Sequence, residues 1–487
     1  MKKVFSILLA LVMTMSLCAT SFAADSTTYS ITIKNDVEGH TYEAYQIMTG
    51  DLATKDGNEV LSNVQWGSNA KQTGAVSDAI LKNMTVEEAA SYVDFTTNPV
   101  ATSTYADGKY TISGLAAGYY LVKDKDNSIS GDDTYTSYII QVLGTTEIAP
   151  KGDKPSVEKK VKDTNDSTGA TTDWQDSADY DIGDTIPYQL TGTLPTNYAE
   201  YKQYYYKFTD TMSAGLTYKN DAKVYVVKGE SKIDITEKCS IVSNKNAANE
   251  TVLTVSIDDL KVLGVSIDKD SKIVVEYSAI LNDQAKIGAD GNPNVVDLTY
   301  SNNPNQQSGG TPDTGKTLED KVIVFTYELD ANKYANEVKA GNELPGAGFT
   351  LYKKDAATNE YKAVGEEVTG EGMTKFIWTG LDDGEYKLVE TTTPAGYNTM
   401  KPVEFTISAE HDSENVDPKL SALSCTLENF EATLNTGVIE GNIINQSGAT
   451  LPETGGIGTY IFYAVGGLLL VGAAVMLVAK KRMEGQN

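Results

Sequence analysis

Short segments in which apolar and polar residues alternate recur along this chain, and they constrain its fold more than any other feature. The clearest of them are 29–33, 138–142, 223–227, 252–257, 272–277 and 321–329. A period of two places successive side chains on opposite faces of a β-strand, and turn-forming residues separate the segments. Helical periodicity is sparse, with one candidate at 85–92. The pattern predicts a mostly β chain, built of antiparallel sandwiches in series.

Two changes in composition divide the chain into parts. Its 487 residues correspond to roughly two to four domains. Residues 150–155 are rich in proline and lysine, and residues 302–316 are rich in asparagine, glutamine, glycine and serine. We therefore expect an N-terminal domain at 24–150, a middle domain at 151–303, a linker at 304–316 and a C-terminal domain at 317–448.

The composition excludes several classes of function. With 40 basic and 67 acidic residues, the net charge is −27, and a chain this acidic repels phosphate backbones, so nucleic acid is not an expected partner. The two histidines, His40 and His411, have no recognisable ligand spacing, and no calcium, zinc or phosphate loop is evident. We therefore expect no metal and no cofactor. Cys239 and Cys425 fall in different expected domains and are predicted to be unpaired thiols.

Both ends of the chain carry targeting segments. Residues 1–23 combine two lysines, an apolar run and small residues ending at Ala23, which predicts a secretory signal peptide. Near the other end, an apolar segment at 457–479 is long enough to cross a bilayer, and basic residues at 480–482 would hold its end in the cytoplasm. This predicted transmembrane segment follows the pentapeptide Leu451, Pro452, Glu453, Thr454 and Gly455.

The order of pentapeptide, apolar span and basic tail over residues 451–487 resembles the cell-wall sorting signal of Gram-positive surface proteins. The resemblance implies that a sortase cleaves between Thr454 and Gly455 and passes the threonine carbonyl to an amine. It also implies a secreted chain that is held briefly in the membrane and then anchored to the cell wall.

A second resemblance lies at residues 386–397, which match the YxLxET…PxGY box of Gram-positive pilins and Cna-B-type domains. In those immunoglobulin-like sandwiches, a lysine on the first strand and an asparagine on the last form a spontaneous amide bond. The box glutamate, here Glu390, assists the reaction. Side-chain phase along the expected strands selects Lys333 and Asn445 as its partners.

The middle domain resembles the aspartate-type variant of the same family. Asp210 is in phase with buried aromatic positions and would be the assisting acid. The same phase argument selects Lys159 and Asn302 as the residues that form the bond, with Lys160 left open as an alternative to Lys159. The chain therefore offers two candidate Lys–Asn bonds.

These residue types suit the reaction. Burial favours a neutral lysine amine, which is a nucleophile, and keeps a carboxyl group protonated. The acid polarises the carboxamide and transfers protons as ammonia leaves. Each bond forms once, so the chain is expected to mature itself and not to be an enzyme. In the N-terminal domain Asp124 occupies the acid position, but the strand at 138–142 holds no asparagine, and no bond is expected there.

Residues 148–151, with the sequence Ile-Ala-Pro-Lys, stand at the expected junction of the first two domains. They resemble the pilin motif, which typically ends Tyr-Pro-Lys, although Ala149 stands in place of the tyrosine. Proline fixes the local backbone and presents the next side chain at the junction. The resemblance implies that Lys151 attacks the sortase acyl intermediate, with Lys154 as the alternative.

The resemblance covers nearly the whole chain and points to the SpaA-type backbone pilins, which form the shafts of sortase-assembled pili that support adhesion. It implies identical subunits joined head to tail, pilin-class and housekeeping sortases, ancillary pilins and peptidoglycan as partners. Two alternatives stay open. The first is a monomeric wall-anchored adhesin or an ancillary (tip or basal) pilin. The second is a wall-anchored hydrolase, which would need an exposed pair of acids in a cleft.

Overall fold

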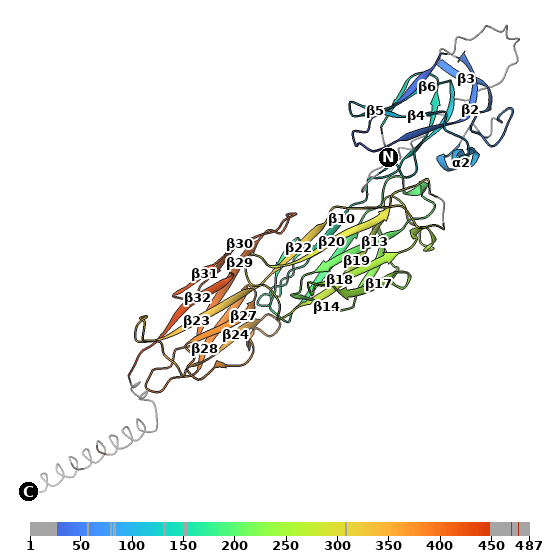
Figure 1. Cartoon of the computed structure of the whole chain (residues 1–487). Helices are drawn as coiled ribbons and strands as arrows, with labels where there is room; N and C mark the ends of the chain where they lie inside the picture. The colour runs from blue at the N-terminus through green and yellow to red at the C-terminus, as the bar shows by residue number, and fades with distance from the viewer. Residues whose placement is uncertain are drawn as a thin grey trace, which may run out of the picture.

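The computed structural model describes residues 27–448, except 56–57, 78–79, 81–83, 130–132, 150–153 and 307–308, together with Leu469 and Met476. These residues form β domains that follow one another along an elongated molecule (Figure 1). Five of the six alternating segments named above each lie within one strand, and the sixth, 321–329, is divided at Thr326 between two strands. The predicted mostly β architecture is confirmed. The signal peptide, Lys151 and the pentapeptide 451–455 lie outside the described residues.

The first domain contains two sheets with one apolar cluster between them, and a short helix that packs against one sheet in a second apolar cluster. One sheet has the order β5-β6-β1-β9, and the other has the order β3-β2-β7-β8 with β4 paired to β2. Helix α2 (Val86–Tyr92) confirms the predicted helix and begins with a capping box between Thr85 and Glu88. The strands are β1 (Tyr29–Ile33), β2 (Tyr42–Lys55), β3 (Asn58–Trp66), β4 (Ala101–Thr102), β5 (Thr104–Ala106), β6 (Lys109–Leu115), β7 (Gly118–Asp124), β8 (Ser137–Val142) and β9 (Thr146–Ile148).

The middle domain is a sandwich of two larger sheets around one tyrosine-rich core. The first sheet has the order β10-β12-β19-β15-β16 with β14 on β19, and the second has the order β11-β22-β20-β13-β18-β17 with β21 on β20. Short 3-10 helices lie at Tyr198–Glu200, Thr236–Lys238 and Leu260–Val262. The strands are β10 (Val157–Val161), β11 (Ser177–Asp179), β12 (Thr185–Gly192), β13 (Tyr206–Met212), β14 (Leu216–Tyr218), β15 (Lys223–Lys228), β16 (Ser231–Asp234), β17 (Ser240–Lys245), β18 (Thr251–Ile257), β19 (Lys272–Leu281), β20 (Asn292–Ser301), β21 (Thr314–Lys316) and β22 (Asp320–Phe325).

The third domain is a smaller sandwich whose first and last strands are neighbours. Its sheets have the orders β27-β23-β32-β31 and β25-β24-β28-β29-β30, with β26 on β24. Strand β23 pairs in parallel with β32, so the two ends of the domain's chain lie side by side. The strands are β23 (Tyr327–Ala335), β24 (Gly348–Asp355), β25 (Glu360–Ala363), β26 (Val368–Thr369), β27 (Lys375–Leu381), β28 (Gly384–Thr392), β29 (Val403–His411), β30 (Leu420–Cys425), β31 (Phe430–Thr433) and β32 (Val438–Asn445).

The boundary between the middle and third domains differs from the expected one. Strand β21 lies within the expected linker and β22 lies beyond residue 317, yet both pair with β20 of the middle domain. Strand β22 turns Val322 and Val324 into the middle core and Ile323 and Phe325 into the core of the third domain. The chain therefore enters the third domain at β23. Composition placed the boundary too early because a strand buried on both faces does not show from its sequence which core it joins.

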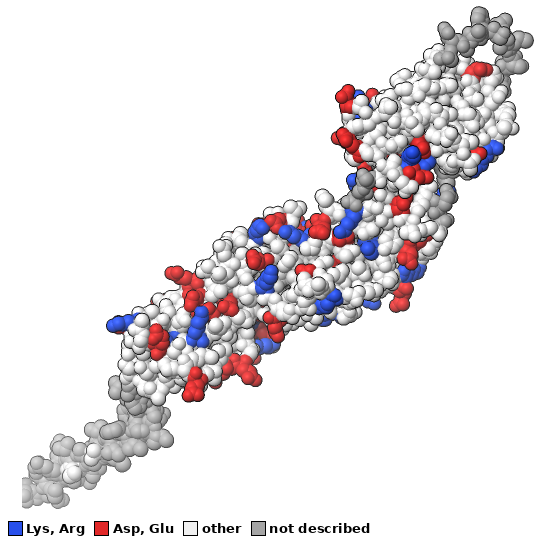
Figure 2. Space-filling view, in the orientation of Figure 1, with Lys and Arg blue, Asp and Glu red and all other residues white. Residues whose placement is uncertain are grey.

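On the face seen in Figure 2, lysines lie singly among acidic side chains, with no continuous basic patch among the coloured residues. Within the part of the chain that the structure describes, no helix combines the length and apolar composition needed to span a membrane. The predicted transmembrane segment 457–479 lies outside that part, apart from two isolated residues.

Candidate functional site

The third domain buries a lysine, a glutamate and an asparagine in direct contact. Lys333 Nζ lies 2.6 Å from Asn445 Oδ1 and 3.0 Å from Glu390 Oε1. Asn445 Nδ2 donates to the same glutamate oxygen at 2.7 Å. The side chains of Lys333 and Glu390 are fully buried. The fold thus brings together the box glutamate and the two residues chosen by side-chain phase.

The topology explains this meeting. Lys333 lies on β23 and Asn445 on β32, and the parallel register places Lys333 beside Ile443, two residues before the asparagine. Glu390 comes from β28 in the opposite sheet and reaches across the core. Its second oxygen accepts the backbone N–H of Met400, which fixes the carboxyl group. The acid is therefore aimed at the carboxamide and not at solvent.

Burial favours the reactive form of the amine. Desolvation lowers the pKa of Lys333, although Glu390 opposes the shift. The ring of Phe349, with its centroid 4.9 Å from Nζ, forms part of the apolar wall. A neutral amine touching a carboxamide, with a carboxyl group touching both, is the arrangement that amide exchange requires.

The middle domain contains a second buried group, centred on a tyrosine. Lys159 Nζ contacts Asp210 Oδ2 and donates to the hydroxyl of Tyr277 at 2.9 Å. That hydroxyl donates to Asp210 Oδ1 at 3.0 Å and accepts from Asn294 Nδ2 at 2.8 Å. Lys159, Asp210 and Asn294 are completely buried, and Asn294 Oδ1 has no hydrogen-bond partner among the described residues. Desolvation lowers the pKa of Lys159 and raises that of Asp210, against the attraction of each for the other.

The structure does not bring Asn302 to this group, and its selection is corrected. In the register of β13 and β20, Asp210 faces Val296, so Asn294 lies two residues from that pair. Asn302 lies beyond the end of β20, where its Nδ2 donates to the backbone oxygen of Asp133 at 2.8 Å. Residues 294 and 302 share one phase, and phase alone could not separate them. Strand register was the missing signal.

The choice between Lys159 and Lys160 is also decided by placement. Lys160 points to the other side of β10, where it lies 2.8 Å from Asp176 and 3.0 Å from Glu414. Desolvation acts to lower its pKa, but these carboxylates outweigh burial and raise it. Lys160 is therefore an ion-pair lysine, and Lys159 is the one that meets Asp210.

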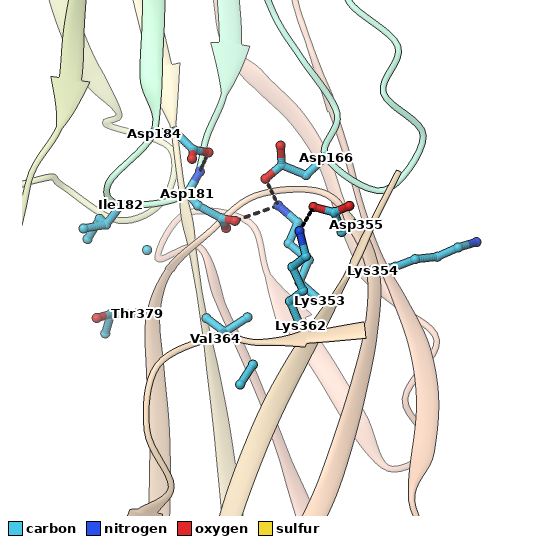
Figure 3. Close-up of a pocket in the computed structure, with 12 residues that line it drawn as sticks. Asp166, Asp181, Ile182, Asp184, Lys353, Lys354, Asp355, Lys362, Val364 and Thr379 are labelled. Carbon is cyan, nitrogen blue, oxygen red and sulfur yellow. Dashed lines mark hydrogen bonds and ion pairs between the residues drawn. The ribbon is translucent and has the colours of Figure 1, made fainter. Parts of the chain in front are cut away.

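Lys353 shows that burial alone does not make a reactive lysine. Its Nζ lies 2.7 Å from Asp181 and 3.2 Å from Asp166 (Figure 3). It also contacts Asp382. Burial acts to lower its pKa, but Asp382 and Asp181 outweigh it and raise the pKa. Lys353 thus stays an ammonium, and among the described residues its Nζ bonds to carboxylates and to no carboxamide. Sequence reasoning missed this cluster because it joins loops of the middle domain to β24 and the turn before β28.

Comparisons with known proteins agree with this architecture. Residues 182–304 match the Cna-B-like domain of the Gram-positive pilin backbone subunit 2, residues 329–419 match the SpaA prealbumin-like fold domain, and residues 443–485 match the LPXTG cell wall anchor motif. The chain belongs to the Gram-positive backbone pilins. The predicted family and its cell-wall anchor are confirmed.

Two curated proteins and one solved structure are similar to this pilin. It is 27% identical over 417 residues to the trypsin-resistant surface T6 protein of Streptococcus pyogenes, covering 72% of each chain. It is 24% identical over 500 residues to fimbrial subunit type 2 of Actinomyces naeslundii, covering 93% of this chain and 85% of the relative. The T6 backbone pilin structure, described as modular and three-domain, matches with a TM-score of 0.54 at 20% identity, covering 88% of this chain and all of the other.

In the first domain of the pilin, Asp124 pairs with a histidine. His40 Nδ1 lies 2.8 Å from Asp124 Oδ1, and His40 Nε2 lies 2.9 Å from Asp133 Oδ2. The other oxygen of Asp124 accepts from the backbone N–H of Thr136 at 2.7 Å. Lys154, half-exposed, lies 3.5 Å from Asp133. The acid position of this domain is thus occupied by an ion pair, and the described part of the domain places no lysine–asparagine pair around Asp124.

This pair should make the first domain sensitive to alkaline pH. Desolvation acts to lower the pKa of His40, but the hydrogen bonds that its ring donates to Asp124 and Asp133 outweigh desolvation and raise the pKa to about 9. Because the folded pKa lies above the unfolded value of 6.5, the stabilisation is complete below pH 6.5 and is lost as pH rises through 9. The free energy of unfolding should fall by about 3 kcal/mol over this range.

Urea unfolding measured through Trp66, with Trp174 and Trp378 replaced by phenylalanine, tests this expectation. A His40→Gln variant should be less stable at pH 6 and should lose the slope between pH 6.5 and 9. An equal slope in the variant and the parent would contradict the assignment.

The two cysteines within the described residues are unpaired, as predicted. Cys239 and Cys425 are free and partly buried. Desolvation raises the pKa of Cys239 to about 12 and also raises that of Cys425. Neither thiol is activated as a nucleophile.

Proposed function

We propose that this pilin forms the shaft of a covalent surface pilus, in which sortase joins Thr454 of one subunit to Lys151 of the next. The backbone-pilin family and the LPXTG anchor support this role. A housekeeping sortase would then attach the polymer to peptidoglycan, and ancillary pilins would decorate it. The pilin itself is a structural protein and a sortase substrate.

The observation that carries the proposal is the contact between Lys333 and Asn445 on neighbouring first and last strands. The neutral amine of Lys333 attacks Cγ of Asn445, and Glu390 takes the amine proton and delivers one to the departing nitrogen. The new Nζ–Cγ bond replaces the Cγ–Nδ2 bond, and one ammonia leaves. The product ties the two ends of the domain together, which suits a subunit pulled from both ends.

We infer a second bond in the middle domain between Lys159 and Asn294, with Asp210 as the acid. Tyr277 contacts all three groups and would hold the lysine and the asparagine at the carboxyl group. A small rotation of the Asn294 amide would turn its unpartnered oxygen toward the acid and its carbon toward the amine. Asn294 takes the role that phase analysis had given to Asn302.

Polymerisation in the presence of a pilin sortase tests the shaft role. Wall extracts boiled in detergent should show a high-mass ladder with the wild-type chain, and Lys151→Ala should abolish it. Lys154→Ala is the matched control and should leave the ladder intact, since Lys154 pairs with Asp133. A ladder that survives Lys151→Ala and disappears with Lys154→Ala would move the nucleophile to Lys154. No ladder with any sortase would favour the monomeric adhesin.

A further inference from the structure

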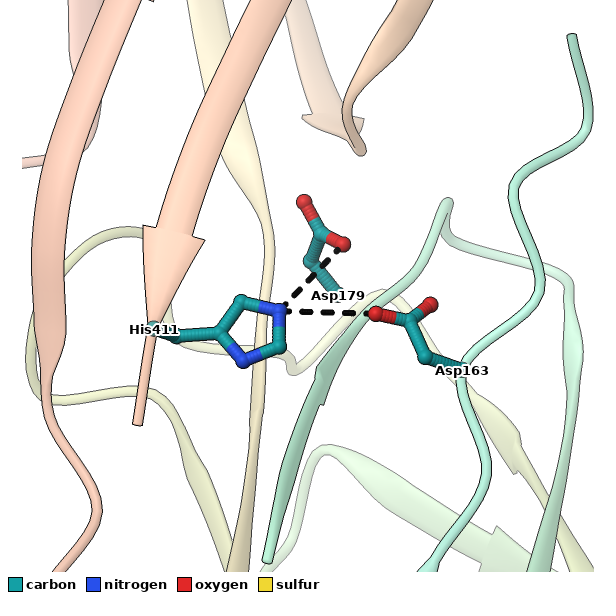
Figure 4. A group of neighbouring side chains, drawn as sticks. All are labelled: Asp163, Asp179 and His411. Carbon is teal, nitrogen blue, oxygen red and sulfur yellow. Dashed lines mark ion pairs between the residues drawn. The ribbon is translucent and has the colours of Figure 1, made fainter. Parts of the chain in front are cut away.

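The second histidine lies where the middle and third domains meet. His411 ends β29 of the third domain and points toward Asp163, after β10, and Asp179, on β11 (Figure 4). Its Nε2 lies 3.4 Å from Asp163 Oδ2 and 3.8 Å from Asp179 Oδ1. The side chains of His411, Asp163 and Asp179 are 11%, 15% and 3% exposed. Two carboxylates and one ring nitrogen thus converge in a nearly buried space.

The hydrogen bonds behind the ring identify its tautomer. Ser177 Oγ lies 2.7 Å from His411 Nδ1 and donates to the backbone oxygen of Asp412. A hydroxyl has one proton, and a carbonyl oxygen only accepts, so the Ser177 proton points to Asp412. The serine oxygen must therefore accept a proton from Nδ1. Because Nδ1 carries the donor, Nε2 presents its lone pair to the carboxylates whenever the ring is neutral.

The distances at Nε2 suit coordination better than hydrogen bonding. An N–H···O bond spans about 2.7–3.2 Å, whereas the ligand atoms of a tetrahedral ion with bonds of about 2.0 Å lie about 3.3 Å apart. His40 provides an internal comparison, since each of its nitrogens has its own carboxylate, at 2.8 and 2.9 Å. At His411, one nitrogen faces two carboxylates, and both are farther away.

We propose that Asp163, Asp179 and His411 bind a divalent transition-metal ion, best fitted by Zn²⁺, with water in the remaining position. One imidazole and two carboxylates form a donor set that zinc accepts, and an imidazole disfavours Ca²⁺ and Mg²⁺. The two carboxylates balance the ion's charge. Coordination requires the neutral ring, so any proton on Nε2 passes to the buffer.

Neighbouring groups fix the orientation of the proposed ligands through hydrogen bonds, as they do in known metal sites. Besides the Nδ1–H bond to Ser177, the second oxygen of Asp179 accepts the backbone N–H of Asp383 at 3.1 Å. Phe325 packs against the imidazole, with ring centroids 5.9 Å apart. The neighbouring carboxylates of Asp181 and Asp382, by contrast, already pair with the Lys353 ammonium, which occupies the place of a cation. The ligands come from segments far apart in sequence, so spacing could not reveal them.

An ion here would join two domains. Asp163 and Asp179 belong to the middle domain, and His411 belongs to the third domain. Zinc would therefore add a link across the junction that neither Lys–Asn group spans.

Zinc titration of the mature extracellular chain tests the proposal, with bound metal measured by equilibrium dialysis at neutral pH. The wild type and His40→Gln should bind one Zn²⁺ with equal affinity, whereas His411→Gln and Asp163→Asn should bind it on the order of 100-fold more weakly. Ca²⁺ should not compete. The Asp163→Asn change keeps the size and shape of the side chain, so its loss of zinc binding cannot be attributed to misfolding, as a loss in His411→Gln could be. A sortase ladder formed by each variant would show that the variant is folded.

Cobalt gives a second readout. Co²⁺ in the site should produce a visible ligand-field spectrum in the wild type and in His40→Gln, and Zn²⁺ should remove it. Two results would overturn the proposal: wild-type affinity no greater than that of His411→Gln, or equal losses in His40→Gln and His411→Gln. In either case the triad is an ion pair only.

Discussion

Replacing Lys333 with alanine should leave the third domain one ammonia heavier than its bonded form, after correction for the substitution, and should lower its stability by about 5 kcal/mol. The bond closes a loop between residues 112 positions apart, and a crosslink of that length removes about this much free energy from the unfolded state. The loss of a buried amine that contacts Glu390 leaves the acid without its partner, which adds to the effect.

Intact mass measures the bond, and a crosslinked peptide that contains residues 333 and 445 locates it. Denaturant unfolding followed through Trp378, which is buried on β27, measures the stability. Lys353→Ala is the matched control, because it removes a buried lysine of the same domain with no carboxamide among its contacts. It should weaken the domain yet keep the ammonia deficit. If the mass of Lys333→Ala still showed the loss of ammonia from the third domain, the proposed bond between Lys333 and Asn445 would be ruled out.

Asn294→Ala should abolish the crosslink of the middle domain, whereas Asn302→Ala should leave it intact. Asn294 shares the Tyr277 hydroxyl with Lys159 and Asp210, whereas Asn302 contacts the backbone of Asp133. The crosslink closes a loop of about 135 residues, so its loss should lower the free energy of unfolding of the middle domain by roughly 5 kcal/mol. Intact mass should show one ammonia lost in the Asn294 variant, from the third domain, and two in the Asn302 variant.

The two variants distinguish the asparagine chosen by strand register, Asn294, from the one chosen by side-chain phase, Asn302. Tyr277→Phe provides a further control, because it removes the hydroxyl that joins the three groups and keeps the ring. We expect its bond to form more slowly, so that the deficit appears over time after refolding. A deficit that Asn302→Ala removes and Asn294→Ala keeps would restore the earlier assignment and imply that the strand register shifts during maturation.

The sequence was informative where the chemistry follows a local pattern. Alternation predicted the strands, and the box around Glu390 with phase along two strands predicted all three members of the third-domain group. Phase also selected Lys159 and Asp210, but its period of two could not distinguish Asn294 from Asn302, because that choice depends on pairing with a distant strand.

Features that arise between domains were beyond sequence reasoning. The Lys353 cluster and the pairing of His411 with its carboxylates bring together residues more than a hundred positions apart, and no local motif marks such contacts. The boundary at β22 was misplaced for a related reason. Its Val-Ile-Val-Phe run is apolar on both faces because two cores share the strand, and such a run looks like an ordinary buried strand of one domain.

The position of β22 determines how far the proposed fibre can lengthen under tension. In the proposed fibre, force would enter a subunit at Lys151, pass from Lys159 to Asn294 and from Lys333 to Asn445 through the two proposed crosslinks, and leave at Thr454. The longest stretch of chain between the crosslinks is 294–333, which contains β21 and β22. Fully drawn out, its roughly forty residues would reach only about 130 Å. Each subunit would thus yield by a fixed length and then resist as a covalent chain, while the first domain, which precedes Lys151, would bear no tension.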